Sequence, residues 1–314
     1  MDRRVFMVSA GASALASANL LAQTSAPGPA PGSAPGIAPG AGQAPFSAGM
    51  ARPFKVGLAL GAGAARGFAH IGVLKSLDQA GIKADVIAGT SAGSLVGVFY
   101  AAGFTPWQME DVALKVRDID VADMSTASKR GMFAGEALQK LVNGYVKNAL
   151  IESFKIPFGA VATDLRTGDM VLMRTGDAGQ AVRASCSIPG VFVPASINGK
   201  ELVDGGLTSP LPVQAARQLG ADFVIGVDVG AKPQNPVQSG LYEVLLQSFE
   251  VMGRALTKAE SVQAEFMIRP DTAKFSSTDF AARKELIQSG YEASELGLAR
   301  LKLAIAGARS RKKA

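Results

Sequence analysis

The chain has 314 residues, of which 48% are hydrophobic and 18% charged, so it can bury a large core in one or two domains. Its single cysteine, Cys186, excludes an intrachain disulfide, and one cysteine with one histidine argues against a zinc site. The net charge of +6 is modest, and no basic run alternates with aromatic residues, which argues against nucleic-acid binding.

The N-terminal residues 1–22 have the pattern of an export signal. Arg3 and Arg4 precede a mildly apolar, uncharged stretch that ends in Leu20-Leu21-Ala22, and this arrangement resembles the twin-arginine type of signal. Residues 23–50 are mainly Ala, Pro, Gly and Ser, a composition typical of an extended linker. We therefore expect an exported protein, periplasmic or secreted. The alternative is a cytoplasmic protein whose translation starts at Met50.

A folded domain is expected over residues 51–308, followed by a basic tail at 309–314. Strands and helices alternate from about residue 54 onward, which predicts an α/β fold. The predicted strands are 55–60, 85–88, 158–163, 170–174, 201–203 and 223–227. The predicted helices include 67–80, 92–102, 106–116, 135–148, 178–187, 211–219, 240–263 and 281–305.

A glycine-rich run follows the first predicted strand and opens a helix: Gly61, Ala62, Gly63, Ala64, Ala65, Arg66 and Gly67. Glycines at such a turn let several backbone N–H groups point into one concavity, which favours an anion or a developing oxyanion. A dinucleotide-binding fingerprint does not fit, because Arg66 stands where the third glycine is required. Arg66 is interpreted either as a positive charge near the oxyanion or as a partner in a structural ion pair.

The second predicted strand ends in the pentapeptide Gly89-Thr90-Ser91-Ala92-Gly93, and a helix follows. A serine between a strand and a helix is typical of a nucleophile elbow, where flanking glycines prevent a clash between the two backbones. The alternative is a glycine turn that is capped by Thr90 or Ser91.

A nucleophilic serine needs a base, and no histidine follows Ser91. The one histidine, His70, precedes it and is expected to be a packed structural residue, with a catalytic role as the alternative. Asp204 is the other candidate, because it ends a short predicted strand directly before Gly205 and Gly206. Asp-Gly is also a common hairpin turn, so a purely structural interpretation stays open.

These blocks together resemble bacterial members of the patatin-like phospholipase family. The glycine-rich block (57–67), the nucleophile block (89–93), an Ala-Ser…Pro…Phe-x-Pro stretch (184–194) and the aspartate block (204–206) stand in the family's order. The resemblance covers roughly residues 54–295. One departure is Ala62, where many members have a third glycine.

The resemblance implies a three-layer α/β/α sandwich with a mostly parallel central sheet and a Ser91–Asp204 dyad. The oxyanion hole would come from Gly61, Ala62, Gly63, Ala64, Arg66 and Gly67, and the motif glycines would be Gly89, Gly93, Gly205 and Gly206. The implied activity is hydrolysis of fatty-acyl esters of phospholipids through an acyl-enzyme, without a metal or other cofactor and with transient contact to a membrane surface.

Two other functions stay open: hydrolysis of other acyl esters or thioesters, and a non-catalytic lipid-binding or regulatory role. The apolar segments 241–246 and 296–305 are interpreted either as walls of an acyl groove or as ordinary core.

Overall fold

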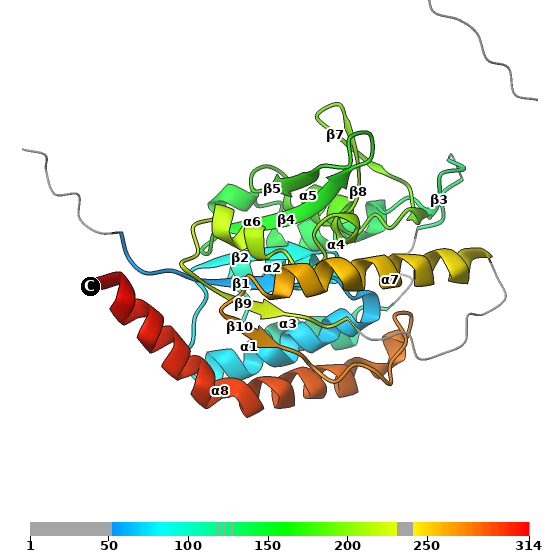
Figure 1. Ribbon diagram of the computed structural model, residues 1–314. Coiled ribbons are helices and arrows are strands. Elements are labelled where there is room, and N and C mark those ends of the chain that lie inside the picture. Colours follow the sequence, from blue (N-terminus) through cyan, green and yellow to red (C-terminus); the bar gives the residue numbers. More distant parts are fainter. Residues whose placement is uncertain (1–51, 118–119, 122, 127, 231–240, 314) are drawn as a thin grey trace, which may run out of the picture. The chain divides into compact units, whose positions relative to one another are not determined.

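A mostly parallel β-sheet forms the centre of the protein (Figure 1). The computed structural model describes residues 52–313 except 118–119, 122, 127 and 231–240, and it describes no side chains at 241–243. The export signal and the linker predicted at 1–22 and 23–50 lie outside the described residues and stay predictions. None of the described helices is both long and apolar enough to cross a membrane.

The strand order of the central sheet is β10-β9-β1-β2-β4-β8-β7, with β5 paired to β4 off this path. Strands β10, β9, β1, β2 and β4 are parallel neighbours, whereas β5, β7 and β8 add antiparallel pairs at the β4 side. The strands are β1 (Val56–Leu60), β2 (Val86–Thr90), β4 (Phe158–Asp164), β5 (Met170–Met173), β7 (Ala195–Ile197), β8 (Lys200–Asp204), β9 (Phe223–Val227) and β10 (Phe266–Ile268). A separate parallel pair joins β3 (Gly131–Phe133) to β6 (Gly190–Phe192).

Helices cover both faces of the sheet because its central strands are apolar on both sides. All residues of β1, β2 and β9 are buried. Leu58 and Leu60 pack with helices α1, α2 and α8, while Ala59, which points the other way, packs with α6. The helices are α1 (Ala69–Gln79), α2 (Ala92–Ala102), α3 (Pro106–Lys115), α4 (Glu136–Val146), α5 (Ala178–Ser185), α6 (Val213–Gln218), α7 (Leu241–Ser261) and α8 (Arg283–Lys313). The predicted α/β fold with a mostly parallel central sheet is confirmed.

The connections around β1 determine where a site can form. The chain passes from β1 through α1 to β2 on one side, and β9 occupies the other side of β1. In parallel α/β sheets, ligands bind beyond the carboxyl ends of the strands at such a reversal of strand order. The glycine-rich run and Ser91 directly follow β1 and β2, so both lie at this edge.

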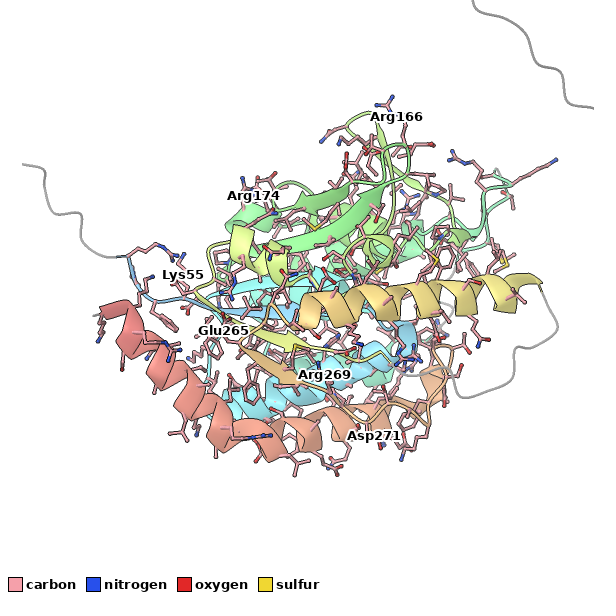
Figure 2. The ribbon with its side chains drawn as sticks, in the orientation of Figure 1. Lys55, Arg166, Arg174, Glu265, Arg269 and Asp271 are labelled. Carbon is pink, nitrogen blue, oxygen red and sulfur yellow. The ribbon has the colours of Figure 1, made fainter. Side chains whose placement is uncertain are left out.

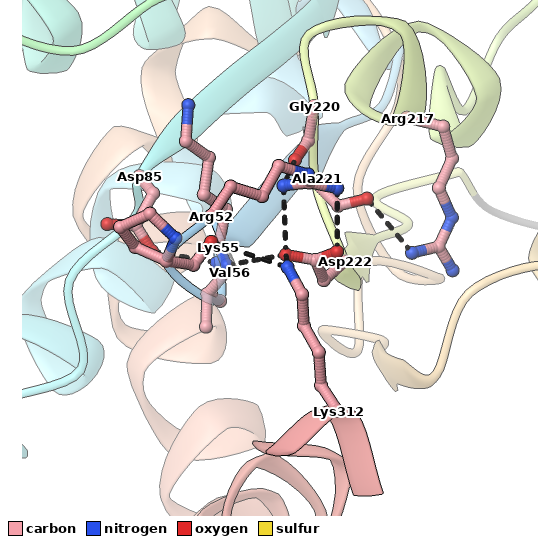
Figure 3. Close-up of polar contacts among 10 residues, drawn as sticks. Arg52, Lys55, Val56, Asp85, Arg217, Gly220, Ala221, Asp222 and Lys312 are labelled. Carbon is pink, nitrogen blue, oxygen red and sulfur yellow. Dashed lines mark hydrogen bonds and ion pairs between the residues drawn. The ribbon is translucent and has the colours of Figure 1, made fainter. Parts of the chain in front are cut away.

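Four short strands, β3, β6, β7 and β10, were not predicted; each has three residues, too few for a recognisable periodicity. A second difference concerns the predicted basic tail, since α8 continues to Lys313. Lys312 at its end donates to the Asp222 carboxylate, over 2.7 Å (Figure 3). This part of the predicted tail is therefore helical and attached to the folded domain.

Asp222 connects three segments at the amino end of the sheet. Its carboxylate accepts bonds from the guanidinium of Arg52 (2.8 and 3.1 Å), the N–H of Lys55 (2.9 Å) and the ammonium of Lys312 (Figure 3). Burial alone would raise the pKa of Asp222, but these donors outweigh it and hold the pKa below its ordinary value.

We expect Asp222→Ala to lower the free energy of unfolding by about 1–3 kcal/mol at neutral pH, because a half-buried N–H and two cations lose their acceptor. Since the pKa of Asp222 is depressed in the fold, this contribution is complete above the unfolded pKa of about 3.9 and is lost as the pH falls below it. Urea unfolding at neutral and acid pH measures both effects. Asp120→Ala, which breaks a solvent-screened pair with Arg117, is the matched control and should lower the free energy of unfolding much less than Asp222→Ala. Equal losses from the two variants would contradict the account.

Candidate active site

Ser91 lies at a strained turn between β2 and α2. Its backbone has φ 52° and ψ −123°, a conformation that few residues other than glycine adopt. The two backbones approach closely here: a Cβ on Gly89 would lie 2.4 Å from the carbonyl oxygen of Gly93, and one on Gly93 would lie 2.1 Å from that of Leu60. The strand, serine and helix are therefore arranged as a nucleophile elbow requires, and both glycines are needed for it.

The register of the sheet brings Asp204 to the level of Ser91. Thr90 at the end of β2 pairs with Val161 of β4, and the next residue of β4, Ala162, pairs with Asp204 of β8. Ser91 and Asp204 thus flank the same strand at the same height. A turn of 3-10 helix, Gly205–Leu207, follows Asp204, and a Cβ on Gly205 would lie 2.3 Å from the carbonyl oxygen of Val161.

The environment of Asp204 suits a base. Its carboxylate is buried, and burial raises the pKa of Asp204 to about 6, against the opposing effects of the Ser91 side chain and the Gly206 N–H. Oδ1 accepts the Gly206 N–H over 2.7 Å, whereas Oδ2 has no hydrogen-bond partner among the described residues. The Ser91 hydroxyl is near enough to influence this pKa but does not form a bond of ordinary geometry, as is common at catalytic sites without substrate.

Ser91 and Asp204 line a cavity of about 630 Å³. The volume lies within the range of ordinary small-ligand sites. Its wall combines the turn after β1, the ends of β2 and β8, the segment after β9, and one side of α7. Apolar side chains of the wall include Ile188, Leu207, Leu246 and Phe249.

The turn after β1 offers fewer free N–H groups than the sequence predicts. The N–H of Gly61 donates to Val227 O (3.0 Å), that of Ala62 to Pro210 O (2.8 Å) and that of Arg66 to Gly63 O (3.0 Å). Gly63 and Ala64 line the cavity, and within the described part of the chain their N–H groups have no acceptor. The predicted oxyanion hole is accordingly narrowed to Gly63 and Ala64.

Gly67 allows two segments to pack closely, because a Cβ at this position would lie 2.4 Å from the Cβ of Ala92. It lets the turn after β1 press against the start of α2.

Arg66 forms the ion pair that was one of its two predicted roles. Its Nη2 lies 2.9 Å from Oε1 of Glu250 on α7, and its side chain is nearly buried. The guanidinium also lines the cavity, so its charge acts on the site while Glu250 partly neutralises it.

Ser185 is a residue that the sequence reasoning did not assign to the site. Its Oγ accepts the Ser91 N–H over 2.9 Å and donates to Val161 O over 2.5 Å, and the side chain is fully buried. This hydroxyl fixes the elbow to β4, the strand that also pairs with Asp204.

We expect Ser185→Ala to destabilise the protein by about 1–3 kcal/mol, because it leaves a buried N–H and a buried C=O without partners. It should also lower kcat with little change in KM, because Ser91 loses its anchor. Thermal unfolding and steady-state kinetics measure the two effects. Ser187→Ala is the matched control, since among the described residues the buried Ser187 hydroxyl bonds Arg183 O alone. If both variants lower kcat equally at equal stability, Ser185 has no positioning role.

A loop at residues 209–211 connects α7 to both halves of the site. Glu260 of α7 accepts bonds from the Ser209 hydroxyl and the Leu211 N–H. In return, Ser209 O accepts from the Thr90 hydroxyl (2.7 Å) and Pro210 O from the Ala62 N–H. Helix α7 therefore supports the elbow and the glycine-rich turn at once, a link that no local sequence pattern shows.

His70 does not line the cavity. It is fully buried in α1, where Nε2 lies 2.8 Å from Gly61 O, and burial lowers the pKa of His70 to about 4, so it is neutral at pH 7. The structure thus places it as a support for the glycine-rich turn. Of the apolar segments considered above, Leu246 of α7 lines the cavity, whereas Leu301 and Ile305 of α8 belong to the core.

Comparison with known proteins identifies the chain's relatives. An uncharacterized NTE family protein of Mycobacterium bovis is 36% identical over 214 residues, which cover 67% of this chain and 59% of that protein. Lysophospholipase NTE1 of Coccidioides immitis is 32% identical over 278 residues, covering 79% of this chain and 18% of that protein. Human patatin-like phospholipase domain-containing protein 6 is 34% identical over 192 residues, covering 59% and 14%. The chain spans less than two thirds of the length of these relatives.

Among solved structures, VipD from Legionella pneumophila aligns with a TM-score of 0.45 and 14% identity, over 80% of this chain and 68% of that one. The family model for patatin-like phospholipase matches residues 58–217, about half of the chain. These residues contain the glycine-rich turn, Ser91 and Asp204. The resemblance seen in the sequence is confirmed: the chain belongs to the patatin-like phospholipase family.

Proposed function

We propose that the protein hydrolyses fatty-acyl esters of phospholipids or lysophospholipids through a Ser91–Asp204 dyad. The observation that carries this proposal is the placement, on one cavity, of a strained elbow serine and a buried carboxylate oxygen that has no hydrogen-bond partner in the described part of the chain. Family membership and the name of the lysophospholipase relative support a lipid substrate.

The chemistry follows from these groups. Asp204 takes the proton of the Ser91 hydroxyl as Oγ attacks the ester carbonyl, and the N–H groups of Gly63 and Ala64 stabilise the resulting oxyanion. Protonated Asp204 then gives its proton to the leaving alkoxide, which departs as the lysolipid or the glycerophosphoryl alcohol. Water, deprotonated by Asp204, attacks the acyl-enzyme and releases the fatty acid with Ser91 restored.

A raised pKa makes Asp204 more effective in this cycle than an ordinary aspartate. A carboxylate with a pKa of about 3.9 is a weak base at neutral pH, whereas burial brings Asp204 to about 6. The carboxylate is still mostly ionised at pH 7 and yet accepts a proton more readily. The apolar wall formed by Leu207, Leu246 and Phe249 is suited to an acyl chain.

The test is to incubate wild type and Ser91→Ala with phosphatidylcholine, lysophosphatidylcholine and a p-nitrophenyl ester, and to quantify the products by mass spectrometry. We expect equal amounts of fatty acid and deacylated lipid from wild type and neither from the variant. Cleavage of the p-nitrophenyl ester alone would indicate a different acyl ester or thioester as substrate. No cleavage of any ester would support a non-catalytic lipid-binding role.

A further inference from the structure

Helix α7 has an inner side on the cavity and an outer side on solvent. In the view of Figure 1 it crosses in front of the central strands, and Figure 2 marks Glu265 and Arg269 on the segment that follows it. Leu246, Phe249 and Gly253 lie on the cavity side. Yet no described side chain of α7, from 244 to 261, is fully buried. The helix is therefore held by few contacts, chiefly the bonds of Glu250 and Glu260.

The outer side of α7 is apolar where a surface helix is ordinarily polar. Val244, Leu245, Val251 and Met252 have exposed fractions of 44%, 45%, 56% and 54%, and Val251 also lines the cavity, so it lies where the two sides of the helix meet. Their spacing of one, seven and eight residues places them on one face over two turns. We call these residues the outer face of α7. A contiguous apolar face of this kind on a soluble domain marks an interaction surface.

The described charged side chains of α7 that lie beside the outer face are cations. Arg254 and Lys258 of α7 are exposed next to it, and both also line the cavity, so they stand between the outer face and the site. Both acids of α7 with described side chains are used inside: Glu250 pairs with Arg66, and Glu260 binds the 209–211 loop. An apolar helix face flanked by cations, with no acid beside it among the described side chains of α7, fits the surface of an anionic bilayer, where the apolar side chains enter the interface and the cations meet phosphates.

We propose that the outer face of α7 is the surface by which this protein binds anionic phospholipid bilayers. This inference rests on the proposed lipid-hydrolase function and identifies how the substrate reaches the site. Because the other side of the same helix lines the cavity of Ser91, docking through α7 places the cavity beside the lipid. A single acyl chain then moves from the bilayer along α7 without crossing water.

The experiment is vesicle flotation with full-length protein that carries Ser91→Ala, so that no lipid is consumed. Vesicles are phosphatidylcholine with or without phosphatidylglycerol. Leu245 and Met252 are exchanged together for serine, since neither lines the cavity. We expect at least about tenfold weaker binding from the loss of two interfacial side chains. Arg254→Gln with Lys258→Gln should weaken binding only to vesicles that contain phosphatidylglycerol.

The matched control exchanges Leu296 and Leu303 of α8 for serine. These leucines are 86% and 75% exposed but lie away from the cavity wall, so the control should float like the parent protein. A second measurement uses Cys186→Ala protein with a single cysteine at position 252 or 303, labelled with an environment-sensitive fluorophore. The emission should shift to the blue on vesicles at 252 and stay unchanged at 303.

Three results would overturn the proposal: no flotation of the parent protein, flotation of the Leu245/Met252 variant equal to the parent, or equal loss in the α8 control. Light scattering without vesicles tests whether a second copy of this chain, rather than a bilayer, covers the outer face of α7. A dimer that the Leu245/Met252 exchange dissociates would assign the outer face to self-association instead. Since flotation uses inactive protein, its failure leaves the ester-hydrolysis test independent.

Discussion

Replacing Ser91 with alanine is expected to lower ester hydrolysis by a factor on the order of 10⁴ or more, because removing the nucleophile of a serine hydrolase leaves only the contribution of the remaining site. The same change should alter the free energy of unfolding by less than about 1 kcal/mol, since the Ser91 hydroxyl forms no ordinary hydrogen bond with any described residue and alanine tolerates φ 52° no worse than serine. Turnover of a dissolved fluorogenic ester and thermal unfolding measure the two quantities.

Cys186 provides the control, because its thiol lies near Ser91. Burial and the charge of Asp204 raise the pKa of the Cys186 thiol well above its ordinary range, so it stays protonated and unreactive. Cys186→Ala should retain activity within severalfold of wild type. Loss of turnover in Cys186→Ala but not in Ser91→Ala would assign the nucleophile to the thiol.

Replacing Asp204 with asparagine should separate activity from stability. Turnover is expected to fall by about 10²–10⁴-fold, the usual cost of losing a general base. Asparagine can still accept the Gly206 N–H, so the turn is preserved. In wild type, kcat should rise with pH through about 6 as Asp204 loses its proton, and this limb should be absent from the residual activity of the variant.

Asp204→Asn is expected to raise the free energy of unfolding although it lowers activity. Asp204 binds its proton more tightly in the fold than in the unfolded chain, so ionised Asp204 destabilises the native state above about pH 6. Asp204→Asn should therefore be more stable than wild type at pH 7, by up to roughly 3 kcal/mol, and the gain should shrink as the pH falls toward the ordinary aspartate pKa of about 3.9. A variant that loses activity because it unfolds would not support the dyad.

His70 is the control for the rise of kcat with pH near 6, which we call the pH limb. Its pKa of about 4 lies too low to produce a limb near pH 6, and it contacts Gly61 rather than the cavity. His70→Gln should lose stability and keep the wild-type limb. If His70→Gln removes the limb and Asp204→Asn keeps it, a histidine-based mechanism replaces the dyad.

The elements that the sequence predicts well carry local signals. The buried strands β1, β2 and β9 are short apolar runs between turn residues, and the elbow at Ser91 needs glycines within two positions of the serine. Asp204 could be proposed because it ends a short predicted strand directly before two glycines and stands in the block that resembles the family's aspartate block. Each of these inferences uses neighbours in the chain.

The supporting contacts could not be predicted because they join distant positions. Ser185 anchors a residue 94 positions away, and Glu260 bonds one 51 positions away. The oxyanion hole was assigned too broadly for the same reason: Val227 and Pro210, whose carbonyls occupy the N–H groups of Gly61 and Ala62, are remote in sequence. A glycine-rich run shows that N–H groups can converge but not which of them stay free.

The most direct measurement of the dyad is labelling with a fluorophosphonate, which reacts with an activated serine and needs no knowledge of the substrate. Wild type, Ser91→Ala and Asp204→Asn are treated in parallel, and the adduct is located by peptide mass spectrometry. We predict one adduct on the peptide that contains Ser91 in wild type, none in Ser91→Ala, and much slower labelling of Ser91 in Asp204→Asn. An adduct on another serine, undiminished labelling of Ser91→Ala, or a wild-type rate in Asp204→Asn would contradict the assignment of Ser91 as nucleophile and Asp204 as its base.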